Sequence, residues 1–289
     1  MKGTIIVSRD LDLVSNHFNC VIGQYCSNAS LAFIYESELD SGLINILKAK
    51  GVPVIGGARL NKIAQSILMD RLSINHPKTF FTNQLQPINS IDLLNAYVDL
   101  DEFVVKPING ARGIAVKLIS RKDFKKCLAN RNEIHSVFAD ERKFLKEEEN
   151  SDIGYVKIES YISSMIIQEP INVSKEFRLI LFKPGNKLIY ERERKQGQFC
   201  ANLSHGSTPK AVDEDFYKQH FSKIEKAFLK IMDDFEYPFL SIDLYLDKNN
   251  VAGCFEFQME FAYEGFDHIL VRNNMIESIN YFIKKYEPF

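Results

Sequence analysis

The sequence predicts an α/β protein that is built from α+β lobes. Short apolar runs alternate with segments of helical spacing in the first half of the chain, a strand-rich block follows, and a β-hairpin lies near the end. With 289 residues and 45% hydrophobic content, the chain can bury a substantial core in one large domain or in two to three small lobes. We expect three parts, at 1–72, 73–165 and 166–289.

Each element is predicted from its own apolar pattern. Short apolar runs predict strands at 5–8, 20–22, 31–35, 52–55, 102–106, 114–119, 165–168, 176–182 and 187–194. Apolar residues three and four positions apart predict helices at 42–50, 60–72, 121–130, through 216–231, and at 274–286. The nearly all-charged stretch 139–150 is expected to be an exposed helix or a loop rather than a functional lid.

Charge, cysteine content and hydropathy exclude several classes of protein. A formal net charge of −2 without a basic tract gives no electrostatic footprint for nucleic acid. No run approaches the ~18 apolar residues of a membrane span, and the first residues lack a signal-peptide layout, so we expect a cytoplasmic protein. The five cysteines contain no C-x-x-C pair and the six histidines are dispersed, which indicates neither a disulfide framework nor a zinc site.

Asp243 and Glu256 are the most informative pair in the sequence. Segments 239–246 and 251–258 are typical of a hairpin, and a two-residue turn at Asn249 and Asn250 would place Asp243 directly opposite Glu256, with Gln258 on the same face. Two like charges opposed across a ladder repel each other, so we expect a cation between them, and magnesium suits oxygen ligands best. A solvated face with coincidental acids is the alternative. The apolar residues alternate onto the opposite face, at Ile242, Leu244, Leu246, Phe255 and Phe257.

A loop that suits phosphate follows a predicted strand. Lys106 ends the strand, and Gly110 and Gly113 follow before a return strand begins. The glycines let backbone N–H groups approach oxyanions closely, and Lys106 adds a point charge. A plain hairpin turn with a snorkelling lysine would have a similar pattern.

Two further places carry polar groups at strand ends. At 168–171 and 175–178, exposed backbone could bind adenine, and a carboxylate such as Glu176 could bind ribose. In the alternating segment 191–194, two arginines share one strand face. Arg178, Arg192 and Arg194 are therefore candidates for bidentate binding of a carboxylate or a phosphate, whereas an exposed charged strand is the alternative for Arg194.

Taken in order, these segments resemble the ATP-grasp superfamily, and within it the RimK-like carboxylate–amine ligases. The resemblance runs from about residue 61 to 265 and rests on motifs in the family's order. These are Asn61-Lys62, His76-Pro77-Lys78-Thr79, Val104-Val105-Lys106-Pro107 with Gly110 and Gly113, Gln168-Glu169, Glu176-Phe177-Arg178, the segment 197–203, Ile242-Asp243-Leu244 and Phe255-Glu256-Phe257-Gln258.

The resemblance implies an ATP-grasp fold, with a small N-terminal α/β domain and two lobes that clasp ATP. It also implies transfer of the γ-phosphoryl group to a substrate carboxylate, followed by displacement of phosphate by an amine. The substrates would be small-molecule or peptide acids and amines, without nucleic acid or membrane, in a possible homo-oligomer. The implied residues are Lys62, Lys106, Gly110, Gly113, Gln168, Glu169, Ile171 and Glu176 for ATP, Asp243, Glu256 and Gln258 for Mg²⁺ or Mn²⁺, and Arg178, Arg192 and Asn202 for catalysis.

The chain departs from the family pattern at several positions. Gln258 stands where the family has asparagine, 259–261 replaces S-P-G, and Cys200 stands where an arginine near the phosphates is expected. Pro170 removes one hinge donor and leaves the Ile171 N–H to contact adenine. These differences predict a divergent branch with its own acceptor. They also keep two alternatives open: a non-catalytic ATP-binding protein, and a phosphotransferase that forms no amide.

Overall fold

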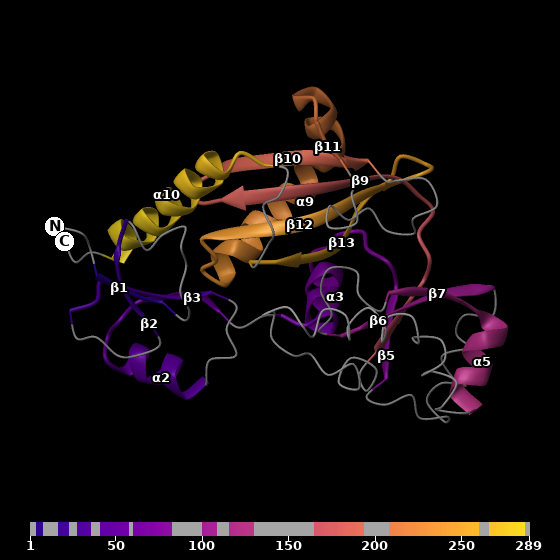
Figure 1. Cartoon of the computed structure of the whole chain (residues 1–289), viewed down its shortest axis with the longest axis horizontal. Helices are drawn as coiled ribbons and strands as arrows, with labels where there is room; N and C mark the ends of the chain where they lie inside the picture. Colours follow the sequence, from indigo (N-terminus) through magenta and orange to yellow (C-terminus); the bar gives the residue numbers. More distant parts are fainter. Residues whose placement is uncertain are drawn as a thin grey trace, which may run out of the picture. The chain divides into compact units, whose positions relative to one another are not determined.

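The computed structural model describes residues 4–7, 17–22, 28–35, 41–57, 60–82, 100–108, 116–129, 165–193, 208–259 and 266–286 (Figure 1). The chain forms two compact units. The first combines Met1–Leu60 with Val173–Phe289, and the second is Asn61–Asn172. The mixed α/β fold predicted from the sequence is confirmed. The three-part division stays a prediction, since the first 60 residues group with the C-terminal part of the chain.

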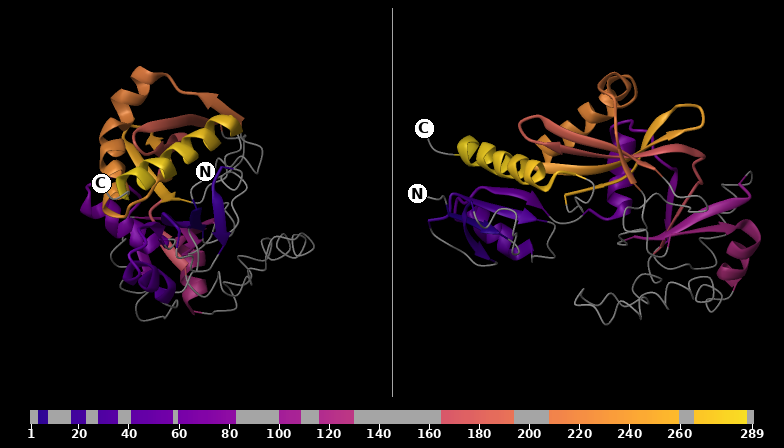
Figure 2. Two further views of the ribbon diagram at one scale, coloured as in Figure 1. Left: turned by 90° about the vertical axis from the view of Figure 1, so that its left-hand side faces the viewer. Right: turned by 45° about the horizontal axis from the view of Figure 1, so that its top comes forward.

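The first unit begins with a parallel sheet in the order β2-β1-β3-β4. Its strands are β1 (Thr4–Val7), β2 (Asn19–Ile22), β3 (Leu31–Tyr35) and β4 (Val54–Gly57), the last lying two residues later than predicted. Helix α2 (Ser41–Ala49) covers one face of this sheet (Figure 2), where Leu47 packs in a core with Ile6, Ala32 and Ile34. Apolar periodicity therefore predicts this layer well.

The first unit continues with a five-stranded antiparallel sheet in the order β11-β10-β9-β12-β13. Its strands are β9 (Val173–Phe182), β10 (Asn186–Glu193), β11 (Thr208–Ala211), β12 (Phe239–Asp247) and β13 (Ala252–Gln258). Helix α9 (Glu214–Asp234) packs on one face through aromatic pairs, with ring centroids of Phe177 and Phe221 4.9 Å apart and those of Phe228 and Phe257 5.1 Å apart. The opposite face of this sheet carries polar residues near its middle, among them Arg178, Arg192 and Asp243.

Helix α10 (His268–Tyr286) begins six residues before the predicted start. The Asp267 carboxylate accepts hydrogen bonds from the N–H groups of Ile269 (2.8 Å) and Leu270 (3.1 Å), which caps the helix. Apolar spacing alone missed this turn because Ile269 and Leu270 are exposed. Among the described residues, no helix is long and apolar enough to cross a membrane.

The two sheets of the first unit contact each other where β3 and β4 lie against the start of β12 and the residues just before it. The Phe33 and Phe239 rings lie 5.7 Å apart, and the Gly56 N–H donates to the Glu236 carbonyl at 2.9 Å. Gly56 has φ +74°, and a Cβ at this position would lie 2.2 Å from the Ile34 carbonyl oxygen. Only glycine fits this strand crossing.

The second unit is built on an antiparallel sheet in the order β5-β8-β6-β7. Its elements are α3 (Lys62–Arg71), β5 (Thr79–Thr82), β6 (Glu102–Pro107), β7 (Lys117–Ser120), α5 (Arg121–Ala129) and β8 (Met165–Gln168). The Asn61 side chain caps α3 by accepting from the Ala64 N–H at 2.9 Å. Neither β5 nor β11, which contains Pro209, is among the strands predicted from the apolar pattern.

Candidate active site

Asp243 lies at the centre of the polar face of the five-stranded sheet. Strand β12 runs between β9 and β13, so Asp243 has Arg178 directly opposite on one side and Glu256 on the other. The predicted opposition of Asp243 and Glu256 is confirmed. Gln258 pairs with Ser241, two positions along the same face.

The register arises differently from the prediction. The turn is not the expected two-residue turn, because Leu246 pairs with Ala252 and the Asp247 N–H donates to the Val251 carbonyl. Asn250 takes a left-handed φ of +58°, and the Asp247 carboxylate accepts from the N–H groups that follow it in the turn. The longer turn shifts the pairing of the two strands by one residue from the predicted register. A bulge between Asp243 and Leu244 then shifts the pairing back by one residue. These two deviations cancel, so the acids still face each other.

Phe255 is the extra residue of that bulge. Pairing passes from Asp243 with Glu256 to Leu244 with Cys254, so Phe255 has no opposite residue in the ladder. Its ring packs against Tyr245, with centroids 4.6 Å apart. The prediction that Phe255 alternates regularly with Phe257 is therefore wrong, because the bulge interrupts the period of two.

Two arginines hold the Asp243 carboxylate. The Arg178 Nε donates to Oδ1 at 2.9 Å and its Nη2 to Oδ2 at 3.1 Å. Arg192 donates from Nη2 to Oδ1 at 2.9 Å and from Nη1 to Oδ2 at 3.2 Å. The side chains of Arg192, Arg178 and Asp243 are only 8%, 13% and 16% exposed, so little water screens these charges. Two arginines therefore supply positive charge to Asp243, and the metal expected between the opposed acids stays a prediction.

The cluster perturbs the ionisation of its members. Burial alone would raise the pKa of Asp243, but Arg178 and Arg192 outweigh it and hold that pKa at about 2. Burial lowers the pKa of Arg192, whereas the Asp243 charge and the Tyr190 hydroxyl raise it above its usual value. Near neutral pH, the cluster is therefore a carboxylate with two guanidinium cations.

Tyr190 is a member of the cluster that sequence reasoning missed. It lies opposite Arg178 in the ladder, two residues before Arg192 on the same face, and its ring packs 4.5 Å from that of Phe266. Burial raises the pKa of its hydroxyl, although Arg192 and Arg178 oppose that shift. Its position two residues before Arg192 indicates that the two side chains share a strand face. Its place opposite Arg178 depends on the pairing of β9 with β10, which was not among the predictions from the sequence.

Glu256, Gln258 and Glu176 complete the polar face. Glu256 and Gln258 are half-buried, and Glu176 is buried opposite Arg192. Asp243, Glu256 and Gln258 offer oxygen atoms on one face, which suits magnesium or manganese. Among the described residues, no group of three or more His, Cys, Asp and Glu could hold a metal. A cation here would depend on two carboxylates and one amide.

In the second unit, the predicted lysines lie close to each other in the fold. Lys106 is 7% exposed on β6, and Lys62 is 9% exposed in the first turn of α3. The Lys62 N–H donates to the Ile108 carbonyl at 3.3 Å, so the start of α3 adjoins the end of β6. Two buried cations beside a helix start suit a phosphate group.

The predicted adenine hinge at 168–171 is hydrogen-bonded to Thr79 at the start of β5 and to Lys78 just before it. Gln168 Nε2 donates to Thr79 Oγ1 at 2.6 Å, and the Glu169 backbone and side chain exchange hydrogen bonds with the Lys78 backbone, both at 3.1 Å. These contacts engage the Glu169 N–H. The role of the Ile171 N–H toward adenine stays a prediction.

Several predicted positions lie outside the described residues. They are Gly110, Gly113, Arg194, Cys200 and Asn202, together with the charged segment 139–150.

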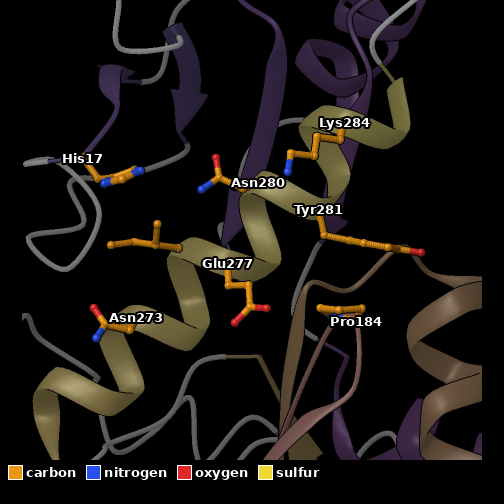
Figure 3. A pocket seen from close by; sticks show the side chains of 8 residues that line it. His17, Pro184, Asn273, Glu277, Asn280, Tyr281 and Lys284 are labelled. Carbon is orange, nitrogen blue, oxygen red and sulfur yellow. The ribbon is translucent and has the colours of Figure 1, made fainter.

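A cavity of about 450 Å³ opens along α10 in the first unit (Figure 3). It is lined by His17, Pro184, Asn273, Ile276, Glu277, Asn280, Tyr281 and Lys284. None of the predicted site residues lines it.

The chain has the ATP-grasp fold. Over nearly its whole length, the chain is similar to solved structures of ATP-grasp ligases. D-alanyl-alanine synthetase A from Vibrio cholerae has a TM-score of 0.64 and 13% identity, with 99% of this chain and 98% of that chain covered. The RimK-like subgroup stays a prediction.

Two further structures share the fold. A RiPP-associated ATP-grasp ligase from Chryseobacterium gregarium, in complex with ADP and a leader and core peptide, gives a TM-score of 0.60 at 11% identity, with 100% and 98% of the two chains covered. D-cycloserine synthetase DcsG gives 0.62 at 11% identity, with 99% and 100% covered. No protein-family profile matches the chain, and no curated protein sequence matches it.

Proposed function

We propose that this protein is an ATP-dependent ligase that joins a carboxylate to an amine through an acylphosphate and releases ADP and phosphate. The observation that carries the proposal is the pair of largely buried arginines on the polar face of the five-stranded sheet, in a fold shared with ligases. ATP, the substrate carboxylate and the acylphosphate are all anionic, and guanidinium groups that are largely buried bind carboxylate and phosphoryl oxygens well.

The residues of the second unit are proposed to bind ATP. Lys62 and Lys106 would contact phosphate oxygens, with Gly110 and Gly113 beyond the end of β6. Gln168 and Glu169 would shape the adenine site, and Ile171 would donate its N–H to the base. The buried lysines and the hydrogen-bonded hinge support these roles. The ADP complex of the Chryseobacterium gregarium neighbour supports the choice of nucleotide.

The residues of the first unit are proposed to bind the ribose, the metal and the reacting acid. Glu176 would bind the ribose, while Arg178, Arg192 and Asn202 would bind the substrate carboxylate and the oxyanion. Glu256, Gln258 and Asp243 would hold Mg²⁺ or Mn²⁺, which when bound would neutralise charge on the β- and γ-phosphates. Asp243 would have to give up an arginine partner to do so.

The remaining steps would start from the acylphosphate. Its carbonyl carbon carries a good leaving group, so a neutral amine attacks it, expels phosphate and gives up a proton to the departing phosphate or to water. Arginines on the carbonyl oxygen stabilise the charge that develops there. No covalent protein nucleophile is needed. The peptide complex of one neighbour favours including peptides among the acids and amines tested.

The proposal is tested by incubating the protein with ATP, magnesium and pairs of amino acids or short peptides. ADP is measured by a coupled assay, and products are identified by mass spectrometry. Amide formation together with ADP supports the ligase. A phosphorylated product without an amide would identify a phosphotransferase, and ATP binding without ADP release from any pair would favour a non-catalytic nucleotide-binding protein. Lys106→Ala should lower any ADP formation that belongs to this site by at least about tenfold.

A further inference from the structure

His76 connects two segments of the second unit through both nitrogens of its ring. Its Nε2 lies 2.9 Å from Oδ1 of Asp70 on α3, and its Nδ1 lies 3.0 Å from the carbonyl oxygen of Pro77, just before β5. Ser66 Oγ, one turn before Asp70 on α3, lies 3.4 Å from the same Nδ1. The imidazole is only 6% exposed, so little water competes for these contacts.

A tight turn after α3 brings His76 back against the helix. Ser73 takes a left-handed φ of +54°, and its N–H donates to the Asp70 carbonyl at 3.0 Å. The Ile74 N–H donates to the Met69 carbonyl at 2.9 Å, and both of these side chains are buried. The end of α3 is therefore closed by its own backbone, which fixes where the imidazole meets the helix.

The two oxygen atoms decide the protonation of the ring. A backbone carbonyl and a carboxylate accept hydrogen bonds, and a neutral imidazole carries a single N–H. A neutral ring would therefore turn a nitrogen lone pair toward Pro77 or Asp70. Only the imidazolium donates at both positions, and the Asp70 carboxylate balances its charge. On the hinge side, the charged residues described nearby are Lys78 and Glu169, and the Lys78 N–H donates to the Glu169 carboxylate.

The imidazole lies between the two halves of the proposed nucleotide site. Helix α3, which carries Asp70, begins with the buried Lys62, and the N–H of Lys62 joins it to the end of β6. Pro77 leads directly into residues 78–79, to which Gln168 and Glu169 of the adenine hinge are hydrogen-bonded. A contact between α3 and Pro77 therefore sets the distance from the phosphate side to the adenine side.

We propose that His76 is a positioning residue that, as an imidazolium, holds α3 against the start of β5 and makes ADP binding dependent on pH. This inference rests on the proposed nucleotide site. Loss of a proton removes one donor and turns a lone pair toward an oxygen, so one of the two contacts is lost. The contribution of His76 is therefore present at low pH and lost as the pH rises. Histidine ordinarily changes its charge between about pH 5 and pH 8, which includes physiological pH.

NMR of protein with ¹⁵N-labelled histidines tests the two contacts without any nucleotide. The His76 signals are assigned by their loss in His76→Gln. At about pH 6, both ring N–H protons of His76 should exchange slowly with water because they are buried and hydrogen-bonded, whereas those of the exposed His17 should exchange fast. At about pH 9, one ring N–H of His76 should be absent. A single slowly exchanging N–H at both pH values would overturn the imidazolium.

The affinity for ADP in the presence of magnesium, measured by titration calorimetry, tests the positioning role. His76→Gln replaces the ring by an amide that does not titrate. The ratio of its Kd to that of wild type cancels the titration of ADP and of groups that both proteins share. This ratio should be at least about 5 at about pH 6 and approach 1 at about pH 9. His220→Gln, on α9 in the first unit, is the matched control and should give a ratio near 1 at both pH values.

The outcomes separate this inference from the proposed function. If wild type binds ADP and the ratio for His76→Gln is the same at both pH values, the pH-dependent contact is refuted and the nucleotide site stands. A ratio near 1 at both pH values would likewise refute the positioning role, even with the expected NMR signals. If wild type binds no ADP at either pH, the nucleotide site and this inference both fail.

Discussion

Replacing Asp243 by asparagine should destabilise the protein. The two guanidinium groups hold the folded-state pKa of the Asp243 carboxylate at about 2, below its ordinary value of 3.8, which corresponds to about 2 kcal/mol at ~1.36 kcal/mol per pKa unit. Asparagine also turns N–H donors toward two largely buried guanidinium groups, and breaking such a pair costs about 3–5 kcal/mol. We expect Asp243→Asn to lose about 2–4 kcal/mol of unfolding free energy at about pH 7.

Urea denaturation followed by circular dichroism measures this loss. Because the folded pKa of Asp243 lies below its unfolded value, the ionised carboxylate stabilises the folded state above about pH 4, and this contribution is lost as the pH falls toward about 2. The difference between wild type and Asp243→Asn should therefore be constant from about pH 7 to pH 5 and shrink in stronger acid.

Glu256→Gln is the matched control, since Glu256 lies opposite Asp243 on the same face and is half-buried. It should change the unfolding free energy by no more than about 0.5 kcal/mol. If repulsion between Asp243 and Glu256 dominated instead, Asp243→Asn would raise the unfolding free energy by about 0.5 kcal/mol. A variant as stable as wild type, or more stable, would refute the arginine account.

Further predictions concern nucleotide, metal and backbone. Lys106→Ala should weaken ADP binding, measured by calorimetry, at least about tenfold because it removes a buried cation. Lys117→Ala on the next strand should leave ADP binding nearly unchanged. Equal losses of affinity in the two variants would show that Lys106 is not part of the phosphate site. Glu256→Gln should weaken Mn²⁺ binding, measured by paramagnetic resonance, by at least about tenfold, and unchanged binding would exclude Glu256 as a ligand. Gly56→Ala should lower the unfolding free energy, measured by urea denaturation, by more than about 3 kcal/mol, since its Cβ would lie 2.2 Å from a carbonyl oxygen. Gly51→Ala has a similar φ of +73° but open space around the Cβ, so it should lower the unfolding free energy by about 1 kcal/mol. Similar losses at both glycines would contradict the steric argument.

Local patterns in the sequence predicted much of the fold. Apolar alternation and helical spacing located most strands and helices, because each depends on neighbours within a few residues. The opposition of Asp243 and Glu256 was also predicted correctly, although a three-residue turn and a bulge produce it together. The turn was misread because Asn250 alone takes the left-handed conformation that was expected of two asparagines.

The arginine cluster could not be predicted in the same way. Arg178 and Asp243 are 65 residues apart, and their contact depends on the pairing of β9 with β12. The sequence pattern indicated Arg178, Arg192 and Arg194 as candidates for binding a carboxylate or a phosphate, but it provided no means of recognising Asp243 as the partner of the first two. The cap at Asp267 and the edge strand β11 were missed because exposed residues dominate both segments.

Oxygen transfer is the most direct test of the proposed ligase. A carboxylic acid that supports ADP formation is labelled with ¹⁸O in its carboxylate, and the released phosphate is analysed by mass spectrometry. An acylphosphate intermediate predicts one ¹⁸O atom in each phosphate, because the amine expels the carboxylate oxygen that received the phosphoryl group. Phosphate without ¹⁸O, released together with ADP, would contradict the acylphosphate route.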